Sequence, residues 1–260
     1  MDSQAFEETG KILGKTRVWE EVKEVKISRD PSAKKYAEKP AELIKYGYDI
    51  DNHPDYQIAK RSSETGITIE GSHLLFPVEL HKKGGENLFV YPLMEASVED
   101  LTHSKPETGK GGVSFFELED TKRIINDVAI ALDALKIKLG VSHGDIRMRN
   151  IRVRDGEYYL ADFSESNFKN PDFLTDKVQF CHLIKCLLVG KLIDQTYGDR
   201  PEAREEAINP LTSQYDEWLN TQVGEHYPNT ILEEFQKFER SSAEVTNQVF
   251  AKKIGEILSG

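Results

Sequence analysis

Three polar side chains, Asp145, Asn150 and Asp162, flank a segment that is typical of a β-hairpin. The segment has two short runs joined by Asp155-Gly156, which is a strong signal for a two-residue turn. Because a hairpin brings its outer ends together, the three side chains should converge. A carboxylate can orient an attacking hydroxyl, and carboxylate and amide oxygens can hold Mg²⁺ against phosphates. The pattern therefore indicates chemistry of the phosphoryl-transfer type.

The order and spacing of these residues are more specific than any one of them. A single Asp or Asn in such a position more often caps a turn. The ordered set H-x-D-x-x-x-x-N from His143 to Asn150, followed by D-F-x from Asp162 to Ser164, resembles the catalytic and metal-binding loops of protein kinases. The two strands between these loops are expected at Ile151–Arg154 and Glu157–Leu160.

The resemblance implies a role for each residue of the two loops. Asp145 would be the catalytic base or would orient the acceptor. Asn150 and Asp162 would bind Mg²⁺. Arg147 stands where many protein kinases carry a Lys near the transferred phosphate. His143 would brace the loop, and a hydrogen-bonded structural histidine is its more common role.

Two helices are expected to position the catalytic loop. Apolar residues three and four apart from Ile125 to Leu139 predict a helix with one buried face, which ends at Gly140 just before the loop. The segment 176–190 is apolar nearly all round and predicts a buried helix. By resemblance, Asp176 at its start would hold the catalytic loop, and a plain helix cap is the alternative.

The first 95 residues predict a small unit rich in strands. Met94, Glu95 and Ala96 follow its last strand, and by resemblance they would form the hinge whose backbone binds adenine. The segment 10–16 has three residues between its glycines, where a phosphate-binding P-loop has four, so a P-loop is not expected. The expected elements are strands at 18–27, 34–39, 41–46, 74–80 and 88–93 and a helix at Pro54–Thr65.

A kinase small lobe also needs a strand lysine for the phosphates and a helix glutamate that fixes this lysine. Lys45 lies in a strand-like run, and Glu64 follows 19 residues later in the predicted helix. We therefore expect Lys45 and Glu64 to form this pair. Lys60, Lys34 and Lys26 are the alternatives, and a solvated strand lysine is another interpretation of Lys45.

Several departures separate this sequence from typical protein kinases. Gly144 replaces the Arg that often binds a phosphorylated activation loop, and Ser164 replaces the Gly of D-F-G. Asp176 comes only 14 positions after Asp162, which leaves no room for a long activation segment. The strand pair expected to cover the phosphates also lacks glycine. The H-G-D form further resembles aminoglycoside and choline phosphotransferases and the smallest atypical protein kinases.

Composition sets the broad class. The chain has 260 residues, of which 38% are hydrophobic and 30% charged, and its formal net charge is -11. This charge argues against a nucleic-acid binder. Cys181 and Cys186 lie in one apolar run, which favours a reducing compartment over a disulfide framework. With His182 they are a metal-site alternative, although a buried helix explains the run more simply. Signal-peptide and membrane-spanning features are not seen, so we expect a cytoplasmic protein.

Together these observations predict an α+β, bilobal protein-kinase-like fold. A small lobe with an antiparallel sheet would span residues 1–95, and a mainly helical catalytic lobe would span 96–260. The expected function is that of a Mg²⁺- and ATP-dependent phosphotransferase, first of all a serine/threonine protein kinase without a phospho-regulated activation loop. A small-molecule hydroxyl kinase of the same fold and a nucleotide-binding pseudokinase or scaffold remain alternatives. ATP and a protein or small hydroxyl acceptor are the expected partners.

Overall fold

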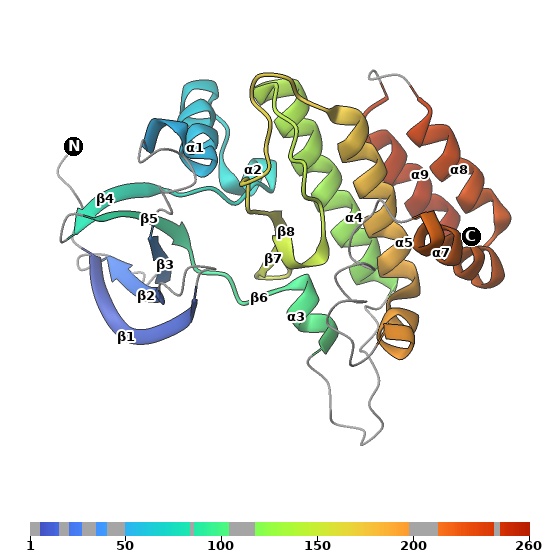
Figure 1. Cartoon of the computed structure of the whole chain (residues 1–260), viewed down its shortest axis with the longest axis horizontal. Coiled ribbons are helices and arrows are strands. Elements are labelled where there is room, and N and C mark those ends of the chain that lie inside the picture. Colours follow the sequence, from blue (N-terminus) through green and yellow to red (C-terminus); the bar gives the residue numbers. More distant parts are fainter. Residues whose placement is uncertain are drawn as a thin grey trace.

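The structure is a computed structural model that describes residues 6–15, 21–27, 35–40, 50–83, 86–103, 118–197, 213–241 and 245–260. Within these residues the expected α+β class is confirmed, because two antiparallel sheets are combined with a large group of helices. In Figure 1 the five-stranded sheet lies at one end of the molecule, the three-stranded sheet lies in the middle, and most of the helices lie at the other end.

The larger sheet has the strand order β1-β2-β3-β5-β4, and every neighbouring pair is antiparallel. The strands predicted at 18–27 and 34–39 are present over residues 21–27 and 35–39, and their first residues, 18–20 and 34, lie outside the described residues. β1 was not predicted, and it includes residues 10–15 of the segment with paired glycines, which are therefore strand and not a phosphate-binding loop. The strand predicted at 41–46 lies outside the described residues. The five strands are β1 (Phe6–Lys15), β2 (Glu21–Ile27), β3 (Lys35–Pro40), β4 (Glu79–Lys83) and β5 (Glu86–Pro92).

The strand predicted at 74–80 is wrong for most of its length. Only its last two residues belong to β4. Leu74 instead forms a parallel bridge with Leu160, and the Leu75 N–H donates to the Leu160 carbonyl at 2.8 Å. Both leucines are buried. This apolar run therefore joins the core beneath the smaller sheet and does not widen the larger one.

The smaller sheet consists of the predicted hairpin and one short strand. β6 (Ala96–Ser97) pairs with β7 (Ile151–Arg154), which pairs with β8 (Glu157–Leu160). The turn residues Asp155 and Gly156 have φ angles of 54° and 76°. A type I′ turn requires positive φ at both central residues. The two strands of the hairpin and its turn are thus confirmed.

The helix predicted before the catalytic loop is confirmed. α4 (Leu118–Asp133) continues as a π-helical segment at Ala134–Leu139, and Gly140 ends it with a φ of 64°. The residues of the predicted stripe that fall in these helices are buried, as is their neighbour Ile124. α4 packs against β8 and against α9 (Asn247–Ser259). This packing fixes the point at which the chain enters the catalytic loop.

The second predicted helix is longer than expected at both ends. α5 spans Phe173–Tyr197, whereas the prediction covered 176–190. It begins early because Asp172 caps it, with Oδ1 accepting from the N–H groups of Leu174 at 3.1 Å and Thr175 at 3.0 Å. Its apolar residues from Phe180 to Leu188 are buried, as predicted, whereas Leu174 in the first turn is exposed.

α1 (Pro54–Thr65) has the predicted bounds. His53 caps its first turn, since Nδ1 accepts the Asp55 N–H at 3.2 Å, and Gly66 follows its last residue with a φ of 70°. The remaining helices are α2 (Ile69–Ser72), α3 (Val98–His103), α7 (Ser213–His226) and α8 (Asn229–Glu239).

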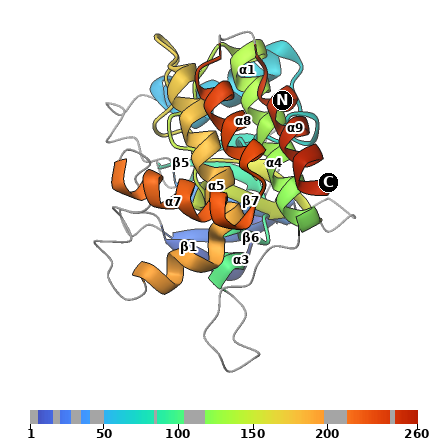
Figure 2. The same ribbon diagram turned by 90° about the vertical axis from the view of Figure 1, so that its right-hand side faces the viewer.

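One apolar core extends from α1 through α4 and α5 to α9. Figure 2 shows α4, α5, α8 and α9 side by side, and the ring of Phe250 on α9 lies 4.0 Å from that of Phe238 on α8. Cys181 and Cys186 are buried free thiols in α5. Within the described part of the chain, none of the helices combines the length and the apolar character needed to cross a bilayer.

Candidate functional site

Side chains of α5 hold the main chain of residues 143–146, in the loop that the sequence predicts to be catalytic. Asp176 accepts hydrogen bonds from the N–H groups of His143 and Gly144, both at 2.8 Å. Gln179 accepts from the Ile146 N–H at 3.0 Å and donates to the Gly144 carbonyl at 2.9 Å. Asp176 therefore holds the loop and is not the helix cap. Gln179 was missed in the sequence, although its position three residues after Asp176 places both on one face of the helix.

Burial shifts the protonation of two groups that hold this loop. It raises the pKa of Asp176 to about 6, although two N–H donors stabilise the anion. It lowers the pKa of His143 to about 4, so the ring is neutral at pH 7. Nδ1 of His143 accepts the Asp145 N–H at 3.2 Å. Nε2 therefore carries the proton and donates to the Ala161 carbonyl at 3.2 Å, which ties the two loops together.

The carboxylate of Asp145 is oriented by two neighbours in its own loop. Arg147 contacts Oδ1 through Nε and Nη2. Asn150 Nδ2 donates to Oδ2 and to the Asp145 carbonyl, both at 2.8 Å. Because both partners of Nδ2 are acceptors, the amide has only one sensible orientation, and its Oδ1 is the atom that could bind a cation. Asp145 is buried, and only 6% of its surface is exposed.

The D-F-S loop lies directly beside the catalytic loop. The Ala161 N–H donates to the Asn150 carbonyl at 2.8 Å, which places the next residue, Asp162, beside Asn150. Asp162 has a φ of 66°, a conformation that Asp tolerates better than most residues. Its Oδ1 accepts the Ser164 N–H at 3.4 Å. The structure thus brings Asp145, Asn150 and Asp162 to one end of the hairpin.

Gly144 has a structural reason to lack a side chain. Its φ is 81°, and a Cβ atom there would lie 2.6 Å from the main-chain oxygen of Glu165. This close approach arises because the segment after the D-F-S motif folds back onto the catalytic loop, where Ser142 and Asn167 form an antiparallel bridge. The Arg that many protein kinases carry at this position could not be accommodated by this backbone.

Asp55, which the sequence did not single out, connects α1, the larger sheet and the D-F-S loop. Its buried carboxylate accepts a hydrogen bond from the Tyr91 hydroxyl on β5 at 2.5 Å and from the Phe163 N–H at 3.3 Å. Burial and the nearby Asp55 raise the pKa of Tyr91, so Tyr91 is the donor. The predicted Glu64 is exposed near the other end of α1 and is not brought to the site. In the sequence, Asp55 is only an acid in the first turn of a helix, which is common.

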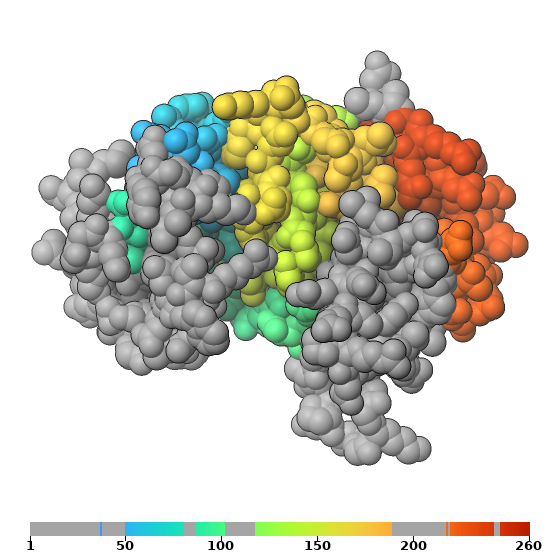
Figure 3. All heavy atoms as spheres, viewed as in Figure 1, coloured from blue at the N-terminus to red at the C-terminus, as the bar shows by residue number. Residues whose placement is uncertain are grey.

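α1 is also fixed to the helical part of the molecule. Arg61 Nη1 donates to the Leu139 carbonyl at 3.0 Å, and the guanidinium lies 5.1 Å from the ring centre of Phe168. In Figure 3 the atoms of α1 (blue) adjoin those of the segment that follows the D-F-S motif (yellow). These contacts set the position of Asp55 relative to the two loops.

Met94, Glu95 and Ala96 connect β5 to the smaller sheet. The Glu95 N–H donates to the Val153 carbonyl at 2.9 Å, and Ala96 pairs with Val153. The Glu95 side chain accepts the Asp155 N–H at 2.8 Å. Among the described residues, the main chain of Met94 has no hydrogen-bond partner. The main-chain groups of Met94 are therefore candidates for binding a ligand.

The candidate phosphate-binding lysines are only partly described. Lys45 and Lys34 lie outside the described residues. Lys60 is exposed on α1, and Lys26 lies on β2. The lysine assignment made from the sequence therefore stays a prediction.

No protein-family model matches this sequence, and no curated protein has a significantly similar sequence. The site is therefore interpreted from its own geometry. Among the described residues, His, Cys, Asp and Glu side chains form no group of three that could hold a metal, so the Cys181 and His182 alternative gains no support. Asn150 and Asp162 would supply two oxygen ligands, and Mg²⁺ usually takes its other ligands from phosphates and water.

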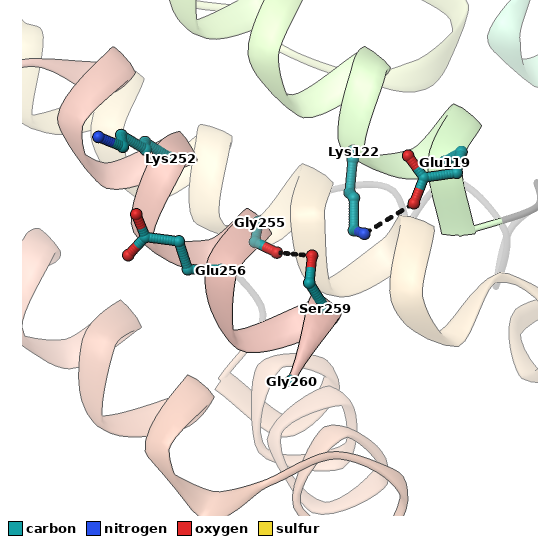
Figure 4. A pocket seen from close by; sticks show the side chains of 7 residues that line it. All are labelled: Glu119, Lys122, Lys252, Gly255, Glu256, Ser259 and Gly260. Atoms are coloured by element: carbon teal, nitrogen blue, oxygen red, sulfur yellow. Dashed lines mark hydrogen bonds and ion pairs between the residues drawn. The ribbon is translucent and has the colours of Figure 1, made fainter.

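A shallow hollow of about 540 Å³ lies between the start of α4 and the end of α9 (Figure 4). It is remote from the loops described above. Arg123, one turn further along α4, donates to the Gly156 carbonyl at 3.2 Å, at the turn of the hairpin and thus opposite its catalytic end. The hollow is lined by Glu119, Lys122, Lys252, Gly255, Glu256, Ser259 and Gly260.

Proposed function

We propose that this chain is a Mg²⁺- and ATP-dependent phosphotransferase of bilobal protein-kinase-like fold that acts on serine or threonine hydroxyls of proteins. The observation that carries the proposal is the Asp145 carboxylate, held by Arg147 and Asn150 beside a second acidic loop. A buried, oriented carboxylate with oxygen ligands next to it is what phosphoryl transfer to a hydroxyl requires. The five-stranded sheet and the helical part would be the two lobes.

In the proposed reaction, the acceptor hydroxyl donates a hydrogen bond to Asp145. Its oxygen forms a bond to the γ-phosphorus of ATP while the bond from that phosphorus to the β–γ bridging oxygen breaks. ADP leaves with the electron pair, and Asp145 takes the hydroxyl proton. Arg147 and Asn150 restrain the carboxylate, so it is already oriented when the acceptor binds. This orientation lowers the entropic cost of phosphoryl transfer.

Asn150 Oδ1 and the Asp162 carboxylate are the groups that would hold Mg²⁺. The two lie beside each other because of the hydrogen bond from Ala161 to Asn150. When bound, the ion would neutralise phosphate charge and link the nucleotide to the D-F-S loop. The main chain of Met94 would receive the adenine ring.

We further propose that Asp55, and not Glu64, is the helix acid of the site. Asp55 is buried and contacts the D-F-S loop through the Phe163 N–H, whereas Glu64 is exposed. An acid that fixes a phosphate-binding lysine must lie close to the metal-binding loop. Asp55 satisfies this condition.

Lys39 joins Lys45 as a candidate for the phosphate-binding lysine. Lys39 stands opposite Phe89 in the β3–β5 register, and Ala37 stands opposite Tyr91. Directly opposed residues of antiparallel strands lie on one face of the sheet. Tyr91, whose hydroxyl donates to Asp55, belongs to this face, so the register assigns residue 39 to the same face of the sheet as Tyr91. Comparing Lys39→Met with Lys45→Met, and with Lys60→Met as an exposed control, tests the assignment.

The decisive experiment is transfer of ³²P from γ-labelled ATP to the chain itself, to generic protein substrates and to small hydroxyl compounds. Label on serine or threonine that disappears in Asp145→Asn supports the proposal. Label only on small acceptors would instead identify a small-molecule kinase. Nucleotide binding without transfer to any acceptor would identify a pseudokinase, and failure to bind Mg²⁺-ATP would reject both.

Activity should not depend on phosphorylation of an activation loop. Gly144 excludes the side chain that would clamp such a loop, and the Ser142–Asn167 bridge closes the short interval before α5. Treatment with a broad-specificity phosphatase should leave the rate unchanged. A large drop would reveal a phosphorylation switch elsewhere in the chain.

A further inference from the structure

Cations are concentrated in the catalytic loop and along β7. Residues 146–154 contain four arginines and no acid, in a chain whose net charge is -11. The two on β7 lie on its partly exposed face, and Arg154 pairs with Glu70 at 3.3 Å. Arg147 contacts the Asp145 carboxylate directly. The position of the remaining loop arginine, Arg149, needs a separate explanation.

Arg149 forms a long ion pair with the same carboxylate but no hydrogen bond. Its Nη2 is 4.0 Å from Asp145 Oδ2, which is beyond hydrogen-bond distance. That oxygen already accepts from Asn150 at 2.8 Å. The Arg149 side chain is 39% exposed, and Arg147 and Asn150 contact the Asp145 carboxylate more closely. Arg147 and Asn150 therefore orient Asp145, and Arg149 is a second, solvent-accessible guanidinium beside it.

We infer that the phosphate acceptor carries an acidic group close to its hydroxyl and that Arg149 recognises this group; the inference rests on the proposed phosphotransferase function. The acceptor hydroxyl must reach Asp145, which places neighbouring groups of the acceptor within range of Arg149. A guanidinium binds carboxylates and phosphates through two parallel N–H donors. The acceptor is thus a serine or threonine in an acidic stretch of a protein.

Because the chain is acidic overall, an acidic acceptor should be attracted only near the arginines of the loop. A net charge of -11 repels acidic segments from most of the surface. An acidic acceptor would therefore gain its affinity at the arginine-rich loop and not through long-range attraction. Substitution of one arginine there should consequently have a large effect on acceptor choice.

Nucleotide phosphates are the competing ligand for Arg149. They would be drawn to Mg²⁺ at Asn150 and Asp162, on the side of the catalytic loop that meets the D-F-S loop. Arg149 precedes Asn150 in the turn Met148–Asn150, which packs against α3 and β6, and its guanidinium lies beside Asp145 Oδ2. We therefore expect Arg149→Gln to leave the Kd for Mg²⁺-ATP unchanged and to weaken only the binding of the acceptor.

The test uses fluorescein-labelled serine peptides of equal length with glutamate, glutamine or lysine flanks. Fluorescence anisotropy in the presence of Mg²⁺ and a non-hydrolysable ATP analogue gives the peptide Kd, and ³²P transfer gives kcat/KM. The wild-type chain should prefer the acidic peptide at least ~10-fold, as expected for a charge-assisted pair. Arg149→Gln should abolish this preference, Arg149→Glu should shift it toward the lysine peptide, and Arg149→Lys should retain part of it.

Lys252→Glu is the matched control, because it makes the same change of charge at an exposed position on α9, far from the loop. It should leave the preference intact. Equal use of all three peptides by an active wild-type chain would overturn the inference. So would a preference that survives Arg149→Glu, or an effect of Arg149→Gln on ATP affinity in place of peptide affinity.

The two readouts separate this inference from the proposed function. If no acceptor is labelled but the acidic peptide still binds through Arg149, the phosphotransferase proposal fails and the acidic recognition stands. If transfer occurs without preference for acidic flanks, the phosphotransferase proposal stands and the acidic recognition fails. Free phosphoserine and glutamate, offered as competitors, identify the source of the anion. Strong competition that depends on Arg149 indicates a small anionic acceptor. Absence of competition indicates an acidic segment of a protein.

Discussion

At the scale of single residues, Asp145 is the side chain on which the proposed chemistry depends. Asp145→Asn keeps the shape but removes the charge, so kcat should fall at least ~10²-fold while the Kd for Mg²⁺-ATP stays nearly the same. Asp155→Asn is the control, since Asp155 lies at the exposed turn of the same hairpin. A preparation of Asp145→Asn that keeps the wild-type rate would show that this carboxylate has no part in transfer.

Gly144 allows a clean test of the packing between the two loops. Gly140→Ala should lower the free energy of unfolding by about 1–2 kcal/mol, because its φ is 64° and nothing else opposes a Cβ there. Gly144→Ala has a similar positive φ and adds a clash with the Glu165 main-chain oxygen. The loss of unfolding free energy in Gly144→Ala, measured by urea denaturation, should therefore be clearly larger than in Gly140→Ala. Equal losses for the two variants would mean that the segment after the D-F-S motif does not pack on the catalytic loop.

His143 should remain neutral well into the acidic range. Burial lowers its pKa from 6.5 to about 4, so the unfolded chain binds more protons between these values. The stability contributed by the neutral ring is thus complete above pH 6.5 and is lost as the pH falls toward 4. The raised pKa of Asp176 acts in the opposite sense over a similar range, so the measurement should follow the His143 ring itself by NMR. Titration of this ring near pH 6.5 would contradict a buried ring that is hydrogen-bonded to the Asp145 N–H and the Ala161 carbonyl.

At the scale of elements, α1 and β5 are joined to the D-F-S loop by one carboxylate. Asp55→Asn should weaken its hydrogen bonds with Tyr91 and Phe163 and lower the free energy of unfolding by about 1.5–3 kcal/mol, the range for bonds to charged groups. It should also weaken Mg²⁺-dependent ATP binding. Glu64→Gln, on the same helix but exposed, should change stability by less than about 0.5 kcal/mol.

Tyr91→Phe provides the second arm of this test. It removes only the hydroxyl donor, and it leaves the Phe163 N–H in contact with Asp55. The nucleotide affinity should then fall less than in Asp55→Asn. If Glu64→Gln were the more damaging variant in either assay, the helix acid would be Glu64 and the assignment of Asp55 would be wrong.

At the scale of the whole molecule, ligand binding should stabilise the fold only when metal is present. At a concentration of Mg²⁺-ATP one hundred times its Kd, the native state should gain about 2.7 kcal/mol, seen as a rise in Tm. Asp162→Asn should remove most of this rise, and asparagine is chosen because it tolerates the φ of 66° at this position. A full Tm shift in Asp162→Asn, or the same shift with EDTA, would exclude Asp162 as a metal ligand.

The sequence by itself determined those features that depend on neighbouring residues. The positive φ angles of Asp155 and Gly156 follow from the turn that this pair favours, and the two strands of the hairpin follow from that turn. The bounds of α1 follow in the same way from proline in its first turn and glycine after its last residue. Asp145 and Asn150 could be recognised because they lie in one short loop.

Only the tertiary structure decided which distant groups share the site. Asp55 and Phe163 are 108 positions apart, and no periodicity or cap in the sequence links them. Leu74 follows a strand-like pattern, but its actual partner is Leu160 in the smaller sheet. The need for glycine at position 144 comes from the Glu165 carbonyl, which arrives there only when the chain folds back. Such contacts depend on the packing of whole elements, and packing overrides local preference wherever a buried partner is available.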